Sequence, residues 1–285
     1  MLKTRILTAV LLLAVFLPAL FWLPQAYWAL LMALVAALAA WEWGGLAGLQ
    51  ARGRLAFGGL VLGICVAGNF VPHTTPVLRI SDFLVLSAFL FWILALPFWL
   101  WRRWRPGKIV LLCLGLVLLC ATWQTFVYWR SVSPWSLLAI MGIAWVADTS
   151  AYFAGRAFGG RKLAPNISPG KTWAGVWGAL AGVAVYGAIL TWQFLPWRWL
   201  SSNQIMVRIS LLMFAFLALS ILGILGDLLE SLLKRQAGLK DSSAILPGHG
   251  GVLDRVDSMM AILPCSLYFF NLPLGVRYYW WSPAY

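Results

Sequence analysis

Long apolar runs separated by short polar stretches make up most of this 285-residue chain. A bilayer core about 30 Å thick needs about 20 apolar residues per helix, and backbone exposed to lipid must satisfy its own hydrogen bonds, as a helix does. The pattern therefore predicts an all-α polytopic integral membrane protein with about nine transmembrane helices. The predicted spans are 6–22, 27–43, 55–71, 83–101, 109–129, 135–153, 173–194, 209–229 and 259–274.

Composition excludes several other classes of protein. Hydrophobic residues make up 62% of the chain and charged residues 10%, whereas a soluble domain is roughly 45–50% apolar and about 25% charged. The four cysteines all lie in apolar runs without C-x-x-C spacing, and the chain has two histidines. A soluble protein and a secreted disulfide scaffold are therefore excluded, and a zinc site is not expected.

The net charge of +13 is explained by membrane topology. Sixteen of the 21 Lys and Arg residues fall at the N-terminus and in every second connection, and five fall on the other side. This bias predicts a cytoplasmic N-terminus and, with nine spans, a C-terminus outside. The first apolar run resembles a signal peptide, but its length and the spans after it favour an uncleaved helix. The basic residues do not form a nucleic-acid-binding face, so no nucleic acid partner is expected.

Polar residues are concentrated in the second half of the chain. Residues 1–130 contain few ionisable residues within the predicted helices, apart from Glu42, and we interpret them as scaffold helices. Residues 135–285 would form the catalytic helices, with cytoplasmic loops at 154–172 and 230–258. No long linker separates these parts, so we predict a single integral membrane domain, 1–285.

Five of the eight carboxylates lie between 227 and 257. Asp227, Glu230, Ser231 and Lys234 share one face of the predicted helix. Charged residues at membrane depth are candidates for function, but Glu230 and Lys234 are also spaced for an ordinary i,i+4 ion pair, which stabilises a helix by about 0.2–0.5 kcal/mol.

A glycine-rich segment follows that helix. Gly248, Gly250 and Gly251 allow close approach of the backbone to a ligand, while Asp254 and Asp257 could share a helical face. Carboxylates that hold Mg²⁺, together with bases that neutralise phosphate, suit a metal-bound polyphosphate. The bases are Lys234, Arg235, Lys240 and Arg255. The alternatives are a basic loop held against anionic lipid and, for His249, an ordinary turn residue.

The second polar region surrounds residues 148–172. Asp148, Tyr152 and Gly155 share a helical face that ends at Arg156. The sequence Gly170-Lys171-Thr172 is not a P-loop, because Pro165 stands where that motif requires glycine. Ser168, Lys171 and Thr172 could instead contact phosphates, and the alternative is a basic membrane anchor.

These residues resemble a known family. The 27-residue segment SLLKRQAGLKDSSAILPGHGGVLDRVD, from Ser231 to Asp257, resembles the signature of the phosphatidate cytidylyltransferases, also called CDP-diacylglycerol synthases. Two upstream patterns, Asp148-x-x-Ala151-Tyr152-x-x-Gly155-Arg156 and Ser168-Pro169-x-Lys171-Thr172-Trp173, are also similar to that family. Ala174 departs from it, because the family usually has Glu there.

The resemblance implies transfer of the cytidylyl group from CTP to phosphatidic acid, giving CDP-diacylglycerol and pyrophosphate. It implies Mg²⁺ as the cofactor, with a second ion such as K⁺ left open. It further implies the cytoplasmic (inner) membrane, an active site facing the cytoplasm, and membrane lipid as a partner; a homodimer is left open.

The resemblance also assigns roles to site residues. Metal ligands would be Asp227, Asp254 and Asp257. The catalytic group would comprise Asp227, Lys234, Arg235, Lys240, Asp241, His249, Asp254, Arg255 and Asp257. Binding of CTP and lipid phosphate would involve Asp148, Tyr152, Arg156, Ser168, Lys171, Thr172, Ser231, Lys234, Arg235 and Arg255.

Two rival functions fit parts of this pattern. A CTP-dependent lipid kinase would share the carboxylates, the bases and the topology, and product analysis would distinguish it. A transporter would be expected to have paired broken helices in two repeats with a site at mid-bilayer. Here the polar residues cluster near one face and in one half of the chain, which favours the transferase.

Overall fold

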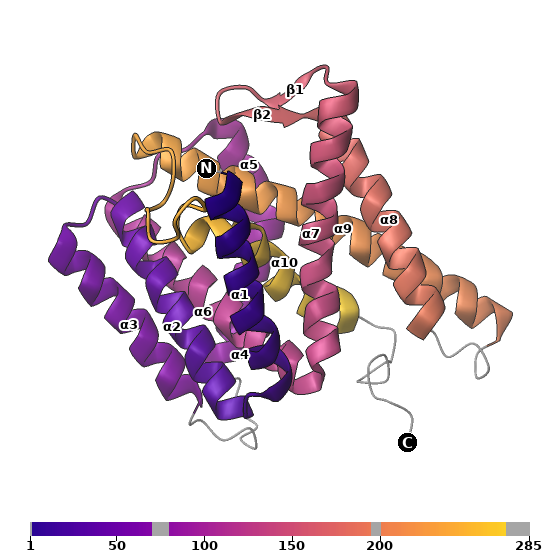
Figure 1. Cartoon of the computed structure of the whole chain (residues 1–285), viewed down its shortest axis with the longest axis horizontal. Coiled ribbons are helices and arrows are strands. Elements are labelled where there is room, and N and C mark those ends of the chain that lie inside the picture. The colour runs from indigo at the N-terminus through magenta and orange to yellow at the C-terminus, as the bar shows by residue number, and fades with distance from the viewer. Residues whose placement is uncertain (1, 70–79, 195–200, 272–285) are drawn as a thin grey trace.

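A computed structural model describes residues 2–69, 80–194 and 201–271, which are almost entirely helical (Figure 1). The N-terminal part contains α1 (Leu2–Trp22), α2 (Gln25–Leu46), α3 (Ala51–Asn69), α4 (Ile80–Leu90), the π-helix η1 (Phe91–Ala95), α5 (Leu96–Arg102) and α6 (Lys108–Val132). The C-terminal part contains α7 (Pro134–Phe158), β1 (Lys162–Ala164), β2 (Ser168–Thr172), α8 (Trp173–Phe194), α9 (Ser202–Gln236) and α10 (Leu253–Asn271).

Seven helical segments of the described residues are long and apolar enough to cross a membrane. They are 25–46, 51–68, 82–102, 108–132, 134–158, 173–193 and 202–236. The prediction of membrane-spanning helices is confirmed, but the count of nine is not. The apolar helix Leu7–Trp22 is shorter than the others, and α10 carries three charged residues in its first two turns. The C-terminal residues of the predicted spans 55–71 and 259–274 lie outside the described residues. So do Arg79, Arg198 and Arg277, three of the five basic residues that the charge bias assigns to the outside; the other two are Arg130 and Arg208.

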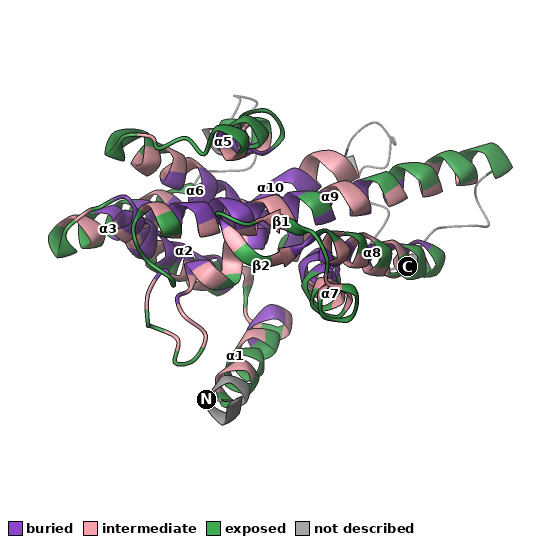
Figure 2. Cartoon of the chain, turned by 90° about the horizontal axis from the view of Figure 1, so that it is seen from above, coloured by how far each residue is buried: buried purple, intermediate pink, exposed green. Residues whose placement is uncertain are grey.

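Helix α10 lies inside the bundle, where it packs against α9, α6, α4, α7 and α2. Five consecutive residues from Met259 to Leu263 are buried, so no side of this stretch faces lipid. Figure 2 shows α10 among buried segments, while α1 stands apart from the main bundle. The C-terminal end of α1 is tied to α6, because Arg130 donates hydrogen bonds to the carbonyls of Leu20 and Leu23 and to Gln25 Oε1.

Helices α9 and α10 approach each other closely because α9 has two glycines at the contact. A Cβ on Gly226 would lie 2.7 Å from the carbonyl oxygen of Asp257, and one on Gly223 would lie 2.9 Å from the Ile262 side chain. Such distances are closer than real Cβ contacts allow. The glycines therefore bring the carboxylates of the two helices near each other.

The two predicted loops are shorter than expected. Helix α7 continues to Phe158. Helix α9 continues to Gln236, because its residues Leu228, Leu229, Leu232 and Leu233 are all buried in the core. The region predicted as a loop at 154–172 contains an antiparallel hairpin, in which Lys162 pairs with Thr172 and Ala164 with Ser168. Strand β2 runs directly into α8.

Candidate active site

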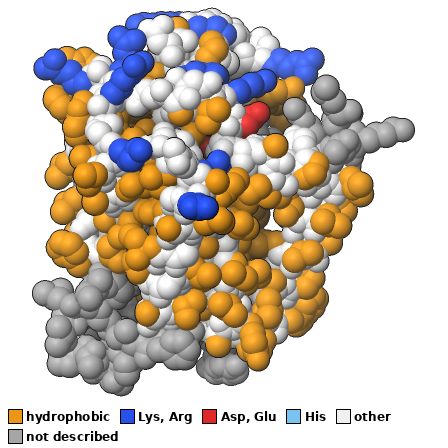
Figure 3. Space-filling model, turned by 90° about the vertical axis from the view of Figure 1, so that its left-hand side faces the viewer, with side chains coloured by type: hydrophobic (Ala, Val, Ile, Leu, Met, Phe, Trp, Pro, Cys, Tyr) orange, Lys and Arg blue, Asp and Glu red, His pale blue; other side chains and the backbone are white. Residues whose placement is uncertain are grey.

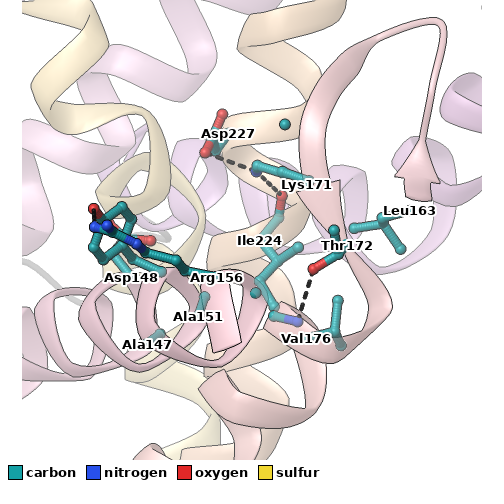
Figure 4. Close-up of a pocket in the computed structure, with 14 residues that line it drawn as sticks. Ala147, Asp148, Ala151, Arg156, Leu163, Lys171, Thr172, Val176, Ile224 and Asp227 are labelled. Atoms are coloured by element: carbon teal, nitrogen blue, oxygen red, sulfur yellow. Dashed lines mark hydrogen bonds and ion pairs between the residues drawn. The ribbon is translucent and has the colours of Figure 1, made fainter. Parts of the chain in front are cut away.

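A cavity of about 480 Å³ lies between α7, β2, α8 and α9 (Figure 4). Helix α7 contributes Asp148, Tyr152 and Gly155, which the sequence placed on one face of this helix, and Arg156 near its end. The Arg156 guanidinium donates a hydrogen bond of 3.1 Å to the Tyr152 hydroxyl. Asp148, Tyr152 and Gly155, predicted to share a face, therefore line one cavity, and Arg156 adds a base to it.

The β-hairpin brings Lys171 to the cavity. Lys171 Nζ lies 2.7 Å from Asp227 Oδ2 and donates to the Ile224 carbonyl at 3.4 Å, as Figure 4 shows. The other oxygen of Asp227 accepts a hydrogen bond from Ser231 Oγ at 3.1 Å. Lys171 and Asp227 are both partly exposed to the cavity, so a ligand there can reach this ion pair.

Three carboxylates meet where α9 and α10 touch. One oxygen from each of Asp227, Glu230 and Asp257 lies within 4.8 Å of the other two. Burial, and then the charge of Asp227, raises the pKa of Asp257 to about 7. Glu230 is 1% exposed, and its Oε1 atom has no hydrogen-bond partner among the described residues.

This group fits a hard divalent cation. Oxygen ligands lie about 2.0–2.1 Å from Mg²⁺, so two ligands on opposite sides are about 4.2 Å apart. Neighbouring ligands in octahedral coordination are about 2.9 Å apart, so the three oxygens, which lie within 4.8 Å of one another, would move closer together to bind one ion. A cation would also relieve the mutual repulsion of carboxylates that lie partly out of water.

Asp254 does not join this group, although the resemblance implied a metal-ligand role for it. Its Oδ1 accepts a 2.6 Å hydrogen bond from Lys234 Nζ. Its Oδ2 accepts hydrogen bonds from Ser242 N, Ser242 Oγ and Gly251 N at 3.1, 2.9 and 2.7 Å. Asp254 therefore holds the loop before α10, and the carboxylates that meet are Asp227, Glu230 and Asp257.

Lys234 lies between two carboxylates. Its Nζ atom is 2.6 Å from both Glu230 Oε2 and Asp254 Oδ1, and its side chain is 13% exposed. The i,i+4 pair with Glu230, considered from the sequence as the alternative to a phosphate contact, is present. The geometry favours a positioning role for Lys234, because its ammonium group is already engaged on two sides.

The other predicted site residues are placed around this centre. Thr172 Oγ1 accepts a hydrogen bond from Gly175 N at 3.1 Å, at the start of α8, and Ser168 begins β2. His249 lies in a turn, with its backbone N–H donating to the Leu246 carbonyl. The exposed members of the set are Arg235, Lys240, Asp241 and Arg255. None of these four forms a side-chain hydrogen bond or ion pair with the three carboxylates in the described part of the chain.

Glu42, interpreted from the sequence as part of the scaffold, reaches the catalytic half. This residue of α2 is fully buried, and its carboxylate accepts hydrogen bonds from the loop before α10. It is the first carboxylate in the sequence, within an otherwise apolar run. An isolated acid in such a run is the signal that could have identified it.

Comparison with known proteins agrees with the motifs. The sequence pattern of the cytidylyltransferase family matches residues 3–272. A phosphatidate cytidylyltransferase from Pseudomonas aeruginosa is 39% identical over 277 residues, which cover 93% of this chain and 95% of the relative. One from Haemophilus influenzae is 35% identical, covering 95% of this chain and 99% of the relative. One from Thermotoga maritima is 38% identical over 148 residues, about half of each chain. The match extends through the scaffold helices as well as the motifs, and the chain therefore belongs to the cytidylyltransferase family.

Proposed function

We propose that this chain transfers the cytidylyl group of CTP to phosphatidic acid, giving CDP-diacylglycerol and pyrophosphate. One observation carries the proposal: in a chain of the cytidylyltransferase family, Asp227, Glu230 and Asp257 meet beside a cavity that also contains Lys171 and Arg156. Carboxylates for a metal ion and cations for phosphate are what the joining of two highly charged phosphates requires.

In this reaction, a phosphate oxygen of phosphatidic acid forms a bond to the α-phosphorus of CTP. The bond between the α- and β-phosphates breaks, and pyrophosphate leaves with that electron pair. The attacking oxygen is already an anion, because a phosphomonoester carries roughly −1.5 to −2 charge near neutral pH. The protein therefore needs no covalent nucleophile, and its work is to position the reactants and to reduce their repulsion.

The residues divide this work between them. Asp227, Glu230 and Asp257 would hold Mg²⁺, which supplies charge neutralisation and orientation for the phosphates when it is bound. Lys171 would leave Asp227 to contact a phosphate oxygen, and Arg156 would bind phosphate through its planar guanidinium group. Tyr152 would keep Arg156 turned toward the cavity through the hydrogen bond between them.

The purified chain in detergent, with CTP, Mg²⁺ and phosphatidic acid, should release pyrophosphate and form CDP-diacylglycerol in equal amounts. Asp227→Asn should remove at least nine tenths of the turnover, a loss above about 1.4 kcal/mol of transition-state stabilisation. Release of CDP with a phosphorylated lipid would instead identify a lipid kinase. Omitting Mg²⁺ should stop the reaction, and added K⁺ would reveal a second ion if the rate rises.

We further propose that the chain lies in the cytoplasmic membrane with its N-terminus and active site facing the cytoplasm and its C-terminus outside. Figure 3 shows Lys and Arg gathered toward one end, above a hydrophobic belt, and positive-inside bias assigns that end to the cytoplasm. Cysteines introduced at positions 165 and 244 should react with an impermeant reagent only after the membrane is opened. Labelling of either cysteine in intact cells would refute this orientation.

A further inference from the structure

The carboxylate of Glu42 is bonded entirely to the segment that precedes and begins α10. Its Oε1 accepts hydrogen bonds from Ser243 Oγ at 2.5 Å and Val252 N at 3.0 Å. Its Oε2 accepts from Ser242 Oγ at 3.2 Å and Leu253 N at 2.6 Å. No Lys or Arg among the described residues forms an ion pair with Glu42.

Two of these donors, Val252 N and Leu253 N, lie at the N-terminal end of α10. The first N–H groups of a helix have no partner within it, and a Ser, Thr, Asp or Asn side chain usually accepts one of them. The residue before α10 is Val252, whose side chain cannot accept a hydrogen bond. Glu42 supplies the missing acceptor from another helix, and its negative charge is favourable at a helix N-terminus.

Ser242 links Glu42 to the acidic centre. Its hydroxyl group lies within hydrogen-bond distance of Glu42 Oε2 and of Asp254 Oδ2. Asp254 in turn binds Lys234, which also pairs with Glu230. A side chain on Gly251 would collide with both Ser242 Oγ and Glu42 Oε1, so these parts pack without spare room.

We propose that Glu42 is a positioning residue for the acidic centre. By holding the loop 237–252 and the first turn of α10 against α2, it fixes where Asp257 stands relative to Asp227. Through Ser242, Asp254 and Lys234, it also fixes the side chain of Glu230. Glu42 does not contact the cavity, so its effect on the reaction passes through these residues.

The first experiment is independent of activity. Hydrogen–deuterium exchange of the detergent-solubilised chain should show faster exchange at residues 237–253 in Glu42→Gln than in the wild type, because the amide group cannot accept all four hydrogen bonds. The control is Trp43→Phe, on the same helix, which removes a partly buried hydrogen bond from the indole to the Leu111 carbonyl. Equal exchange of this segment in both variants would overturn the proposal.

The second experiment rests on the proposed function and uses cytidylyl transfer as its readout. Glu42→Gln should lower kcat at least tenfold and raise the Mg²⁺ concentration for half-maximal rate, with KM for CTP changed less than threefold. Trp43→Phe should keep kcat within twofold when each variant is assayed at the same interval below its own Tm. Glu42→Asp, which keeps the carboxylate, should recover part of the kcat that Glu42→Gln loses. An unchanged kcat in Glu42→Gln would refute the role, whereas inactive wild-type protein would refute the proposed function instead.

A third variant, Ser242→Ala, tests the proposal if Glu42→Gln does not fold. Ser242→Ala removes only the hydroxyl group that joins Glu42 to Asp254. It should accelerate exchange in the same segment and lower kcat severalfold. Wild-type exchange and kcat in Ser242→Ala would overturn the proposed link.

Discussion

Two lysines of this site form ion pairs in contrasting surroundings. Lys171 faces the cavity and pairs with Asp227, and their side chains are 23% and 31% exposed. Lys234 lies away from the cavity between Glu230 and Asp254, whose side chains are 1% and 6% exposed. A cation with one accessible partner can exchange it for a substrate phosphate, whereas a cation enclosed by two carboxylates holds helices together. We therefore expect Lys171 to serve substrate binding and Lys234 to serve architecture, although their partners Asp227 and Glu230 share one face of α9.

The largest effect on stability should come from Lys234→Met. Removing one partner of a buried ion pair costs about 3–5 kcal/mol, because the remaining charge is left unpaired. Denaturant unfolding in mixed micelles should show this loss. Lys171→Met, at the more exposed pair, should cost less than about 1 kcal/mol. Equal losses in the two variants would remove the distinction between the lysines.

Lys171→Met, which should have the smaller effect on stability, should have a large effect on the rate of the reaction. Lys171→Met should lower kcat/KM for CTP about a hundredfold, because a positioned donor at developing charge contributes about 2.7–4 kcal/mol. Lys171→Arg should recover part of the rate, since its charge is kept but its geometry differs. Lys162→Met, on the paired strand of the same hairpin, is the control and should react at the wild-type rate. A fall of less than threefold in Lys171→Met would contradict the phosphate role.

The carboxylates can be separated by their response to metal. Glu230→Gln should raise the Mg²⁺ concentration for half-maximal rate about tenfold, equivalent to about 1.4 kcal/mol. Asp254→Asn should lower Tm and raise the Mg²⁺ concentration for half-maximal rate by less than threefold, because Asp254 acts on the metal site only by positioning Glu230 through Lys234. Metal titrations of initial rate provide the measurement. The reverse pattern would restore Asp254 to the metal site and exclude Glu230.

The smallest effect should follow Tyr152→Phe. The change removes the hydrogen bond that orients Arg156, and such a bond contributes about 0.5–1.5 kcal/mol. We expect a two- to tenfold lower kcat/KM for CTP with unchanged Tm. Phe153→Leu, at the adjacent exposed position, should have wild-type kinetics. Matching kinetics in both variants would show that Tyr152 does not orient Arg156.

The helices could be predicted because lipid imposes a long apolar run on each span. The hairpin could not, because strands of three and five residues leave too short a pattern. Asp254 and Asp257 seemed equivalent from their spacing, but three residues turn a helix by about 300°. The resulting difference of about 60° leaves Asp254 bonded to the loop and to Lys234, while Asp257 meets Asp227 and Glu230. The contact of Glu42 with Ser242 joins positions 200 residues apart, which no local pattern reveals.

The length of α9 has a consequence for kinetics. Its 35 residues extend about 52 Å, and even a 40° tilt leaves about 40 Å along the normal of a bilayer whose hydrocarbon core is about 30 Å thick. The surplus lies among lipid headgroups, and the ionisable residues of α9 near its C-terminal end belong at that depth. A phosphatidic acid molecule can then present its phosphate while its acyl chains stay in the bilayer. Turnover should therefore follow the surface mole fraction of this lipid, and diluting it with neutral detergent at constant bulk concentration should slow the enzyme.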